Sequence, residues 1–300
     1  MKGVRARAEV TLAGIALIWG GSFVVVKVAL NDSSTLAFLA TRFVIASLLL
    51  LGVFWPALTG GRPNRKGWFG GVVCSIFLFL GFAFQTAGLR YTSASNSAFL
   101  TGLYIVLVPL FASALSKRSV RAREWAACGL ALLGTGLMTG AGSERLNIGD
   151  LLTIASAVAF SAHMVAVAHW SPKLSYEWLT LIQVGGVAVL SLASFWWIEQ
   201  PFLHWTPRLI GALALTAVLA TALSFSLYTW AQGHTTATRA ALLFALEPVF
   251  AGLVAWAVAG DLWTGLSLLG AGLILGSILL AELRPDQTNK KAGSTNGSSL

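Results

Sequence analysis

The chain consists of apolar runs of about twenty residues, the length with which an α-helix crosses the hydrocarbon core of a bilayer, separated by short polar segments. Strands that stand alone cannot satisfy their backbone in lipid, so runs of this kind predict helices. Hydrophobic residues make up 56% of the 300 residues and charged residues 10%, which excludes an ordinary soluble domain. The sequence predicts an all-α integral membrane protein with ten transmembrane helices, at residues 9–30, 35–56, 68–90, 94–115, 123–141, 148–169, 176–198, 207–231, 236–259 and 263–283.

Lysine and arginine collect in alternate loops. With the N-terminus inside, the inner segments hold Lys2, Arg5, Arg7, Arg62, Arg65, Lys66, Lys117, Arg118, Arg121, Arg123, Lys173, Arg284, Lys290 and Lys291, and the outer loops hold Arg90, Arg145 and Arg208. Because short cytoplasmic loops carry the positive excess, both termini are predicted to be cytoplasmic. The charges form no single basic face, so no nucleic-acid partner is expected. Residues 285–300, rich in Asn, Gly, Ser and Lys, predict a disordered polar tail.

The second half of the chain repeats the first. Residues 129–140 (GLALLGTGLMTG) and 265–276 (GLSLLGAGLILG) share eight identities at an offset of 136, and residues 92–100 match residues 235–243 at an offset of 143. Pro109 and Pro248 match at 139 instead, which indicates four additional residues in the first copy. Each copy holds five spans, an odd number, so the second copy enters the membrane from the opposite side. The sequence predicts two inverted five-helix repeats, residues 1–141 and 142–284.

No sequence motif for catalysis is present. The chain has no P-loop, HExxH or GxSxG motif and no reactive cluster at membrane depth, so an enzyme is disfavoured and neither cofactor nor metal is expected. An inverted repeat in so apolar a chain is typical of secondary transporters, whose substrate site lies near the bilayer midplane between the repeats. A membrane scaffold is the alternative class, but it leaves the inverted duplication unexplained.

Glu247 is the most informative polar residue within a span. It lies about eleven residues into the ninth span, near the midplane, and Pro248 follows it and loosens the helix. A carboxyl at this depth binds a substrate amine, exchanges a proton or pairs with a buried cation. The alternative for Glu247 is internal pairing with an arginine or a hydroxyl. Tyr104 matches Glu247 at the offset of 143, so the two are predicted to form two walls of one cavity. The alternative for Tyr104 is a packed aromatic with one hydrogen bond.

Further polar and aromatic residues lie at similar depth. Trp19 is in the middle of the first span, and its match at an offset of 141 is Phe160, which His163 follows on the same helix. A cavity with such walls suits apolar or aromatic organic solutes, and core packing is the alternative for each residue. The predicted substrate-binding residues are Trp19, Tyr104, His163, Tyr228, Glu247, Asn96 and Gln85.

Four charged or amide residues near span ends are candidates for gating or structural roles. Lys27 lies near the outer end of the first span, where its side chain can snorkel to the interface. Arg42 is deeper in the second span and needs a partner, as a structural tether or as a ligand for a carboxylate. Asn96 and Arg239 occupy matched positions at opposite faces, where they are predicted to cap helix starts or to form gates. Pro109 and Pro248 belong to the same group.

Two matched glycine pairs indicate close helix packing. Gly136 and Gly140 in the fifth span correspond to Gly272 and Gly276 in the tenth. Small residues with this spacing allow close helix approach, so we expect spans five and ten to pack on each other. A monomer is expected, and a homodimer formed through the same glycines is the alternative.

Several short motifs, in their order along the two repeats, resemble the drug/metabolite transporter superfamily. They are Trp19-Gly-Gly-Ser-Phe23 with Lys27, Arg42-Phe43, Tyr91-Thr-Ser-Ala94 and Leu246-Glu-Pro-Val-Phe250. The chain is most similar to the EamA-type ten-helix members, and among these to bacterial inner-membrane exporters of amino acids.

This resemblance implies an alternating-access exporter of aromatic and other neutral amino acids and related small metabolites, located in the bacterial inner membrane, with the proline-bearing spans four and nine near the site. The alternative is another solute, such as a drug-like cation, riboflavin or a nucleotide-related metabolite. Facilitated diffusion and proton coupling are both compatible with this resemblance.

Overall fold

The computed structural model describes residues 2–116, 119–140, 146–259 and 264–282. In these residues thirteen α-helices and one π-helix combine into ten spans, because three spans are interrupted. The helices are α1 (Lys2–Ala29), α2 (Thr35–Leu58), α3 (Arg65–Gly88), α4 (Ala94–Thr101), α5 (Tyr104–Ser116), α6 (Ala122–Thr139), α7 (Ile148–Trp170), α8 (Tyr176–Ile198), α9 (Pro207–Ala217), η1 (Val218–Leu223), α10 (Ser224–Gln232), α11 (Ala237–Phe244), α12 (Glu247–Ala259) and α13 (Gly265–Glu282). The predicted tail, residues 285–300, and the predicted boundary between residues 141 and 142 lie outside the described residues.

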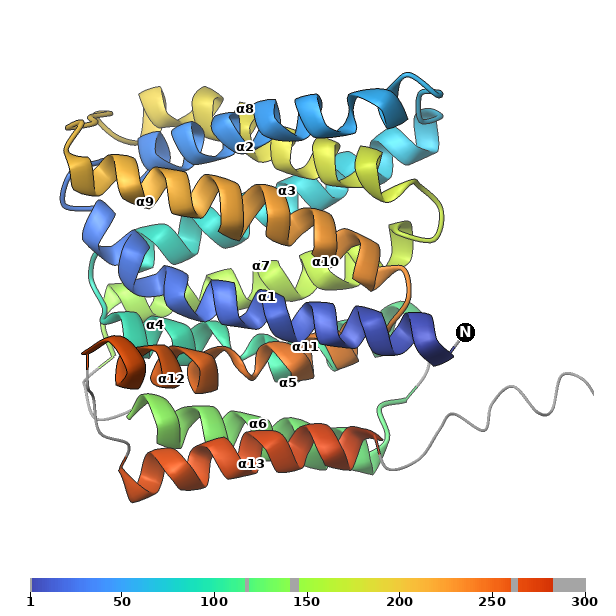
Figure 1. Ribbon diagram of the computed structural model, residues 1–300, viewed down its shortest axis with the longest axis vertical. Coiled ribbons are helices and arrows are strands. Elements are labelled where there is room, and N and C mark those ends of the chain that lie inside the picture. Colours follow the sequence, from blue (N-terminus) through green and yellow to red (C-terminus); the bar gives the residue numbers. More distant parts are fainter. Residues whose placement is uncertain (1, 117–118, 141–145, 260–263, 283–300) are drawn as a thin grey trace, which may run out of the picture.

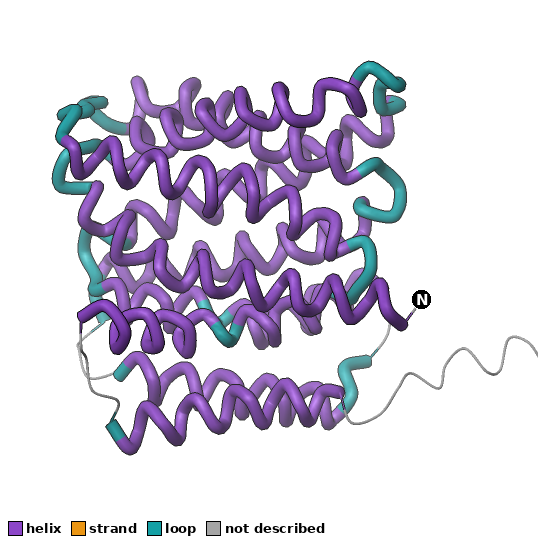
Figure 2. Tube along the Cα trace, in the orientation of Figure 1, coloured by secondary structure: helices purple, strands orange, loops and turns teal. Residues whose placement is uncertain are grey.

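The helices lie side by side with roughly parallel axes (Figures 1 and 2). Seven described stretches are long and apolar enough to cross a membrane, and 265–281 is a shorter apolar helix. The largest difference from the predicted spans is at the N-terminus, where α1 begins at Lys2 rather than near residue 9. An ion pair one helical turn apart, between Arg5 and Glu9, supports this additional helical segment.

The two halves run in opposite directions. α1 starts at the end of the bundle where the N-terminus lies, whereas α7, the first helix of the second half, starts at the other end and runs back (Figure 1). Matched helices pack on each other, α2 on α8 and α6 on α13, and the contact of α3 with α7 is repeated by that of α10 with α1. An approximate two-fold relation between the halves produces these paired contacts. The predicted architecture of ten spans in two inverted five-helix repeats is confirmed.

Glycine allows α6 and α13 to cross closely. A Cβ atom on Gly134 would meet the carbonyl oxygen of Gly270, and a Cβ atom on Gly270 would meet that of Gly134. These two residues match at the offset of 136, so the repeated stretches do pack on each other. The prediction that Gly136, Gly140, Gly272 and Gly276 form this contact was wrong, because the glycines in contact lie on a different face of each helix. Phe99 covers Gly136, and among the described residues nothing comes within 4 Å of a Cβ position at Gly140, Gly272 or Gly276.

Spans four and nine are broken at equivalent positions. α4 and α11 each have eight residues, α5 and α12 each have thirteen, and all four boundaries keep the offset of 143. The prediction of four additional residues in the first copy, made from the proline offset, was therefore wrong. The two prolines are not structural equivalents, since Pro248 is the second residue of α12, where a helix tolerates proline, whereas Pro109 lies inside α5.

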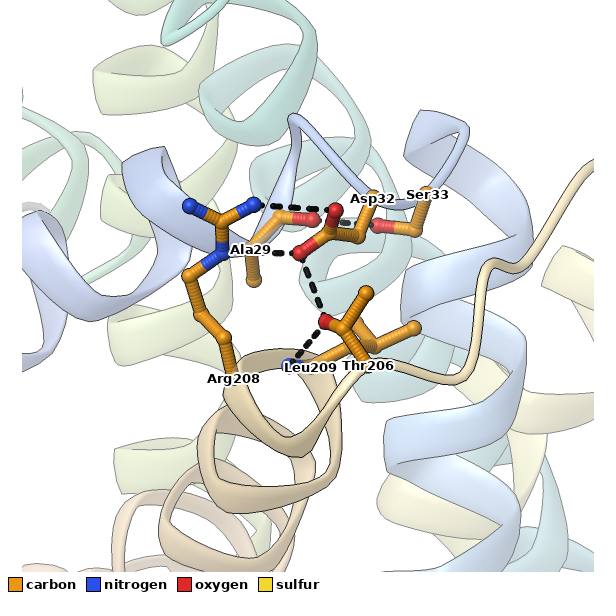
Figure 3. Close-up of polar contacts among 6 residues, drawn as sticks. All are labelled: Ala29, Asp32, Ser33, Thr206, Arg208 and Leu209. Atoms are coloured by element: carbon orange, nitrogen blue, oxygen red, sulfur yellow. Dashed lines mark hydrogen bonds and ion pairs between the residues drawn. The ribbon is translucent and has the colours of Figure 1, made fainter.

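Hydrogen bonds join the α1–α2 turn to the start of α9 (Figure 3). Arg208 donates to both carboxylate oxygens of Asp32, at 2.8 and 3.0 Å, and the Thr206 hydroxyl donates to Asp32 at 2.8 Å. The hydrogen bond from Arg208, followed by that from Thr206, lowers the pKa of Asp32. Thr206 also accepts from the backbone N–H of Leu209 and so caps α9. The bundle end opposite the N-terminus is thus held together across the two halves.

Candidate functional site

A cavity lies between the two halves and receives side chains from α1, α2, α3, α4, α5, α7, α10, α11 and α12. Its volume is about 70 Å³, enough for a few water molecules. Six of the seven predicted substrate-binding residues line it, and Asn96 does not. The lining residues are Trp19, Ser22, Phe23, Arg42, Leu78, Phe82, Gln85, Thr101, Tyr104, Phe160, His163, Met164, Phe225, Tyr228, Phe244 and Glu247.

Tyr104 and Glu247 meet across the cavity. Each is the first residue after the break in its span, at the start of α5 and α12. The Tyr104 hydroxyl donates to the Glu247 carboxyl, with 3.2 Å between the oxygens, and both side chains are buried. Gly20 of α1 packs directly against the backbone carbonyl of Glu247, where a Cβ atom would not fit. The absence of a side chain at Gly20 therefore lets α1 lie directly against the start of α12.

The π-helix supplies hydrogen-bond acceptors to the cavity wall. Wider turns of this kind are frequent at functional sites. The indole N–H of Trp19 donates to the carbonyl of Ala220 within η1, at 3.0 Å. The Trp19 ring also contacts the rings of Phe225, Tyr228 and Phe244, with centroids 4.9 to 6.0 Å apart. One polar bond and three ring contacts thus fix the orientation of Trp19.

Arg42 projects from α2 into the same cavity and is 3% exposed. Its Nε atom donates to the hydroxyl of Thr221 in η1, at 2.7 Å. The guanidinium carbon lies 4.8 Å from the ring centroid of Phe82 and 5.4 Å from that of Phe43. The partner that Arg42 needs is therefore neutral. Within the described residues, no carboxylate lies within 4 Å of it.

His163 is held by a chain of hydrogen bonds behind the cavity wall. Its Nε2 atom lies 2.7 Å from the side-chain oxygen of Gln183, and the Gln183 amide donates to the Thr229 hydroxyl at 2.8 Å. Because the Thr229 hydroxyl donates to the carbonyl of Phe225, it accepts from the Gln183 amide, so the Gln183 oxygen faces His163 and Nε2 is assigned as the protonated nitrogen. The imidazole also stacks on Tyr228, with an interplanar angle of 29°. His163 is therefore both a hydrogen-bonded core histidine and a lining residue.

Sequence reasoning missed three residues that support the cavity: Gln183, Thr221 and Thr229. Only Gln183 had a signal, because it matches Arg42 at the same offset of 141 that relates Trp19 to Phe160. The remaining predicted polar residue, Gln85, donates to the Thr101 hydroxyl at 3.1 Å.

A polar network, which we call the closure, joins α1, the α3–α4 turn, α4 and α7 toward the end of the bundle opposite the N-terminus. The Lys27 ammonium donates to the carbonyls of Leu89 and Thr92, at 2.5 and 2.7 Å, so this side chain caps the end of α3 rather than snorkelling outward. The Thr92 hydroxyl and the Asn96 amide both donate to Asp150. Asn96, predicted to bind substrate or to form a gate, lies in this closure and does not line the cavity.

A wider vestibule of about 480 Å³ opens at the end of the bundle where the N-terminus lies. Pro109 and Arg239 line it, beside residues of α6 and α7. Arg239 forms an ion pair with Glu9 of α1, with 3.0 Å between nitrogen and oxygen. Pro248 lines neither the cavity nor the vestibule. The two prolines thus lie in different surroundings.

The described residues contain no group of three His, Cys, Asp or Glu side chains that could hold a metal ion. They form a membrane bundle of two inverted halves, with an aromatic and polar cavity between them, the closure toward one end of the bundle and a vestibule at the other end. These features define a secondary transporter.

Comparison with known proteins gives the family. The EamA-like transporter family matches the chain twice, over residues 6–140 and 147–283, so the chain belongs to this family. An uncharacterized transporter of Archaeoglobus fulgidus is 35% identical over 93% of this chain and 87% of its own length. The uncharacterized transporter YoaV of Bacillus subtilis is 24% identical, over 90% of this chain and 94% of its own length.

A crystal structure with 18% sequence identity superposes with a TM-score of 0.74 and covers 92% of this chain and 96% of its own. At that identity the similarity concerns the fold.

Proposed function

We propose that the protein exports amino acids, aromatic and other neutral ones, and related small metabolites across the bacterial inner membrane by alternating access. The observation that carries this proposal is the contact of Tyr104 with Glu247, which joins the broken spans of the two halves in an aromatic cavity. Breaks in spans from both repeats, meeting at one cavity, are characteristic of transporter binding sites. The aromatic walls favour organic solutes with apolar side chains.

The vestibule and the closure support a direction of access for this proposal. In the arrangement described, the closure with Lys27 and Asp150 lies toward one end of the bundle, and the vestibule with Arg239 lies at the other end. The basic inner segments favour a cytoplasmic location for the vestibule end. A solute enters from the vestibule, the halves rearrange around it, and the closure opens toward the other face. Because small-molecule pockets commonly measure about 300 Å³ or more, the cavity must widen when the solute enters.

Counterflow in proteoliposomes tests the function. Vesicles loaded with unlabelled solute are given labelled threonine, phenylalanine, riboflavin or a lipophilic cation outside. We expect protein-dependent accumulation of the amino acids. Accumulation of riboflavin or the cation alone would overturn the proposed substrate class, and no protein-dependent flux of any of them would overturn the proposed transport.

A pair of tryptophan variants tests the position of the site. Trp19→Ala removes a cavity wall and should lower amino-acid counterflow by about tenfold or more, as truncation of a buried aromatic anchor commonly does. Trp197→Ala is the matched control, since Trp197 is 89% exposed on the bundle surface. Equal flux in the two variants would place the site elsewhere.

A further inference from the structure

We infer that the cavity binds its substrate as a dipolar ion, with the substrate carboxylate on Arg42 and the substrate ammonium on Glu247. This inference rests on the proposed function and names the charge pattern of the solute. It follows from one basic and one acidic side chain that line one cavity and are both buried, at 3% and 8% exposure. Neither is paired with an opposite charge within 4 Å in the described part of the chain.

Arg42 retains its capacity to bind a carboxylate. A guanidinium has five N–H donors, and the one hydrogen bond that Arg42 makes among the described residues uses Nε. Its two terminal nitrogens remain available, and the group is positioned by Thr221 and by the face of Phe82. A planar guanidinium matches a carboxylate with two parallel hydrogen bonds. The group is thus oriented by neutral partners and keeps its charge for a ligand.

Glu247 is the complementary group. One carboxyl oxygen accepts from Tyr104, and the second has no protein partner in the described structure. Tyr104 is a neutral donor, so it orients the carboxyl and leaves it able to pair with a cation. The break between α11 and α12 and the glycine at position 20 bring this group to the cavity surface. A primary ammonium ion, with three donors, fits the free oxygen.

Electroneutrality determines which solutes fit. Arg42 and Glu247 together add no net charge to the cavity, and an uncompensated charge in a desolvated site is costly. A zwitterion leaves the occupied cavity neutral. An amine without an acid group, or an acid without an amine, leaves one excess charge and one unpaired side chain. The aromatic side of the cavity, with Trp19 and Tyr228, is left for the substrate side chain.

The test uses three forms of one molecule: phenylalanine, phenylalaninamide and N-acetylphenylalanine. Binding to the full-length protein in lipid nanodiscs is measured by titration calorimetry. We expect the wild-type protein to prefer phenylalanine over each of the others by about 30-fold or more, the usual scale for an unpaired buried charge. Comparable affinity for the amide or the acetylated acid overturns the inference and leaves the proposed function standing. No binding and no counterflow of any amino acid overturns both.

Two variants should each change which form of phenylalanine binds best. Loss of a purely structural role would weaken binding of all three forms without changing their order. Arg42→Gln, which gives α2 the residue that α8 carries at the matched position, should favour the amide over phenylalanine. Glu247→Gln should favour the acetylated acid. Arg65→Gln and Glu177→Gln, which remove the same charges outside the cavity, should keep the wild-type order. An unchanged order in either cavity variant contradicts the assignment.

If a glutamine variant does not fold, the charge-conserving variants Arg42→Lys and Glu247→Asp take its place. Each keeps the charge but changes its geometry. We expect weaker binding of phenylalanine with the zwitterion still preferred, and loss of that preference would count against the inference.

Discussion

At the scale of the residue, Tyr104 and Glu247 show how a duplicated site becomes asymmetric. They begin equivalent half-helices, at the offset of 143, yet one is a neutral donor and the other an acid. Two acids at these positions would repel each other across a buried cavity, whereas a phenol beside an acid forms a hydrogen bond. The asymmetry therefore follows from the closeness of the two positions.

Removal of the Tyr104 hydroxyl should destabilise the protein. Tyr104→Phe leaves one acceptor of a buried carboxyl without its donor, and we expect unfolding in detergent to become easier by about 1–3 kcal/mol. Tyr228→Phe is the matched control, because the Tyr228 hydroxyl has no partner among the described residues; its loss should leave stability unchanged or slightly higher. Thermal unfolding followed by tryptophan fluorescence measures both. Equal melting temperatures for the two variants would contradict a contribution from the Tyr104–Glu247 bond.

At the scale of the element, the position of α1 depends on a single missing side chain. Gly20 faces the carbonyl of Glu247, and Gly21, its neighbour, has nothing within 4 Å of its Cβ position. The two glycines are adjacent in the same helix, so they share helix propensity and differ only in what they face. Substitutions at these two positions therefore separate the effect of packing from the effect of helix propensity.

A methyl group at position 20 should therefore be costly. Gly20→Ala forces α1 away from α12, and overpacking of this kind costs about 1–3 kcal/mol, whereas Gly21→Ala should be neutral or stabilising by up to about 1 kcal/mol. Denaturant or thermal unfolding of the two purified variants gives the comparison. If Gly20→Ala were as stable as Gly21→Ala, the close approach of the two helices would not be required.

The elements also show what the sequence determines. Apolar run length and the odd number of spans per repeat predicted ten helices and their inversion, because both follow from the bilayer and from counting. The helix breaks and the π-helix were not predicted. The π-helix makes tertiary contacts, of Ala220 and Thr221 with side chains of α1 and α2, that a pattern of apolar residues does not reveal. Pro109 was misleading because it lies inside α5 whereas Pro248 is the second residue of α12, so the two prolines do not mark matched positions. The pairing of Tyr104 with Glu247 was predictable, as it required only the repeat.

At the scale of the whole molecule, the closure and the vestibule are related by the inversion of the halves. The vestibule lies beside α5, α6, α7 and α11, and the equivalent helices at the other end are α12, α13, α1 and α4. Lys27 spans that second set, from α1 to the residues that precede α4. If the two ends exchange roles during transport, the hydrogen bonds of Lys27 must break when the end of the bundle opposite the N-terminus opens.

Removal of the Lys27 ammonium should therefore favour opening at that end. Lys27→Met deletes two charge-assisted hydrogen bonds, each worth about 1.5–3 kcal/mol, and a difference of this size shifts a two-state population by about tenfold or more. Ser22, which lines the cavity, can report the shift as a cysteine in a background that lacks the buried Cys74 and Cys128.

A membrane-impermeant maleimide applied to the face opposite the N-terminus should label this cysteine faster in the Lys27→Met variant. Lys66→Gln, which removes an exposed lysine at the other end, is the control and should leave the rate unchanged. Equal labelling rates with and without the Lys27 ammonium would show that its two bonds do not hold the closure, and that opening depends instead on the contacts around Asp32 and Asp150.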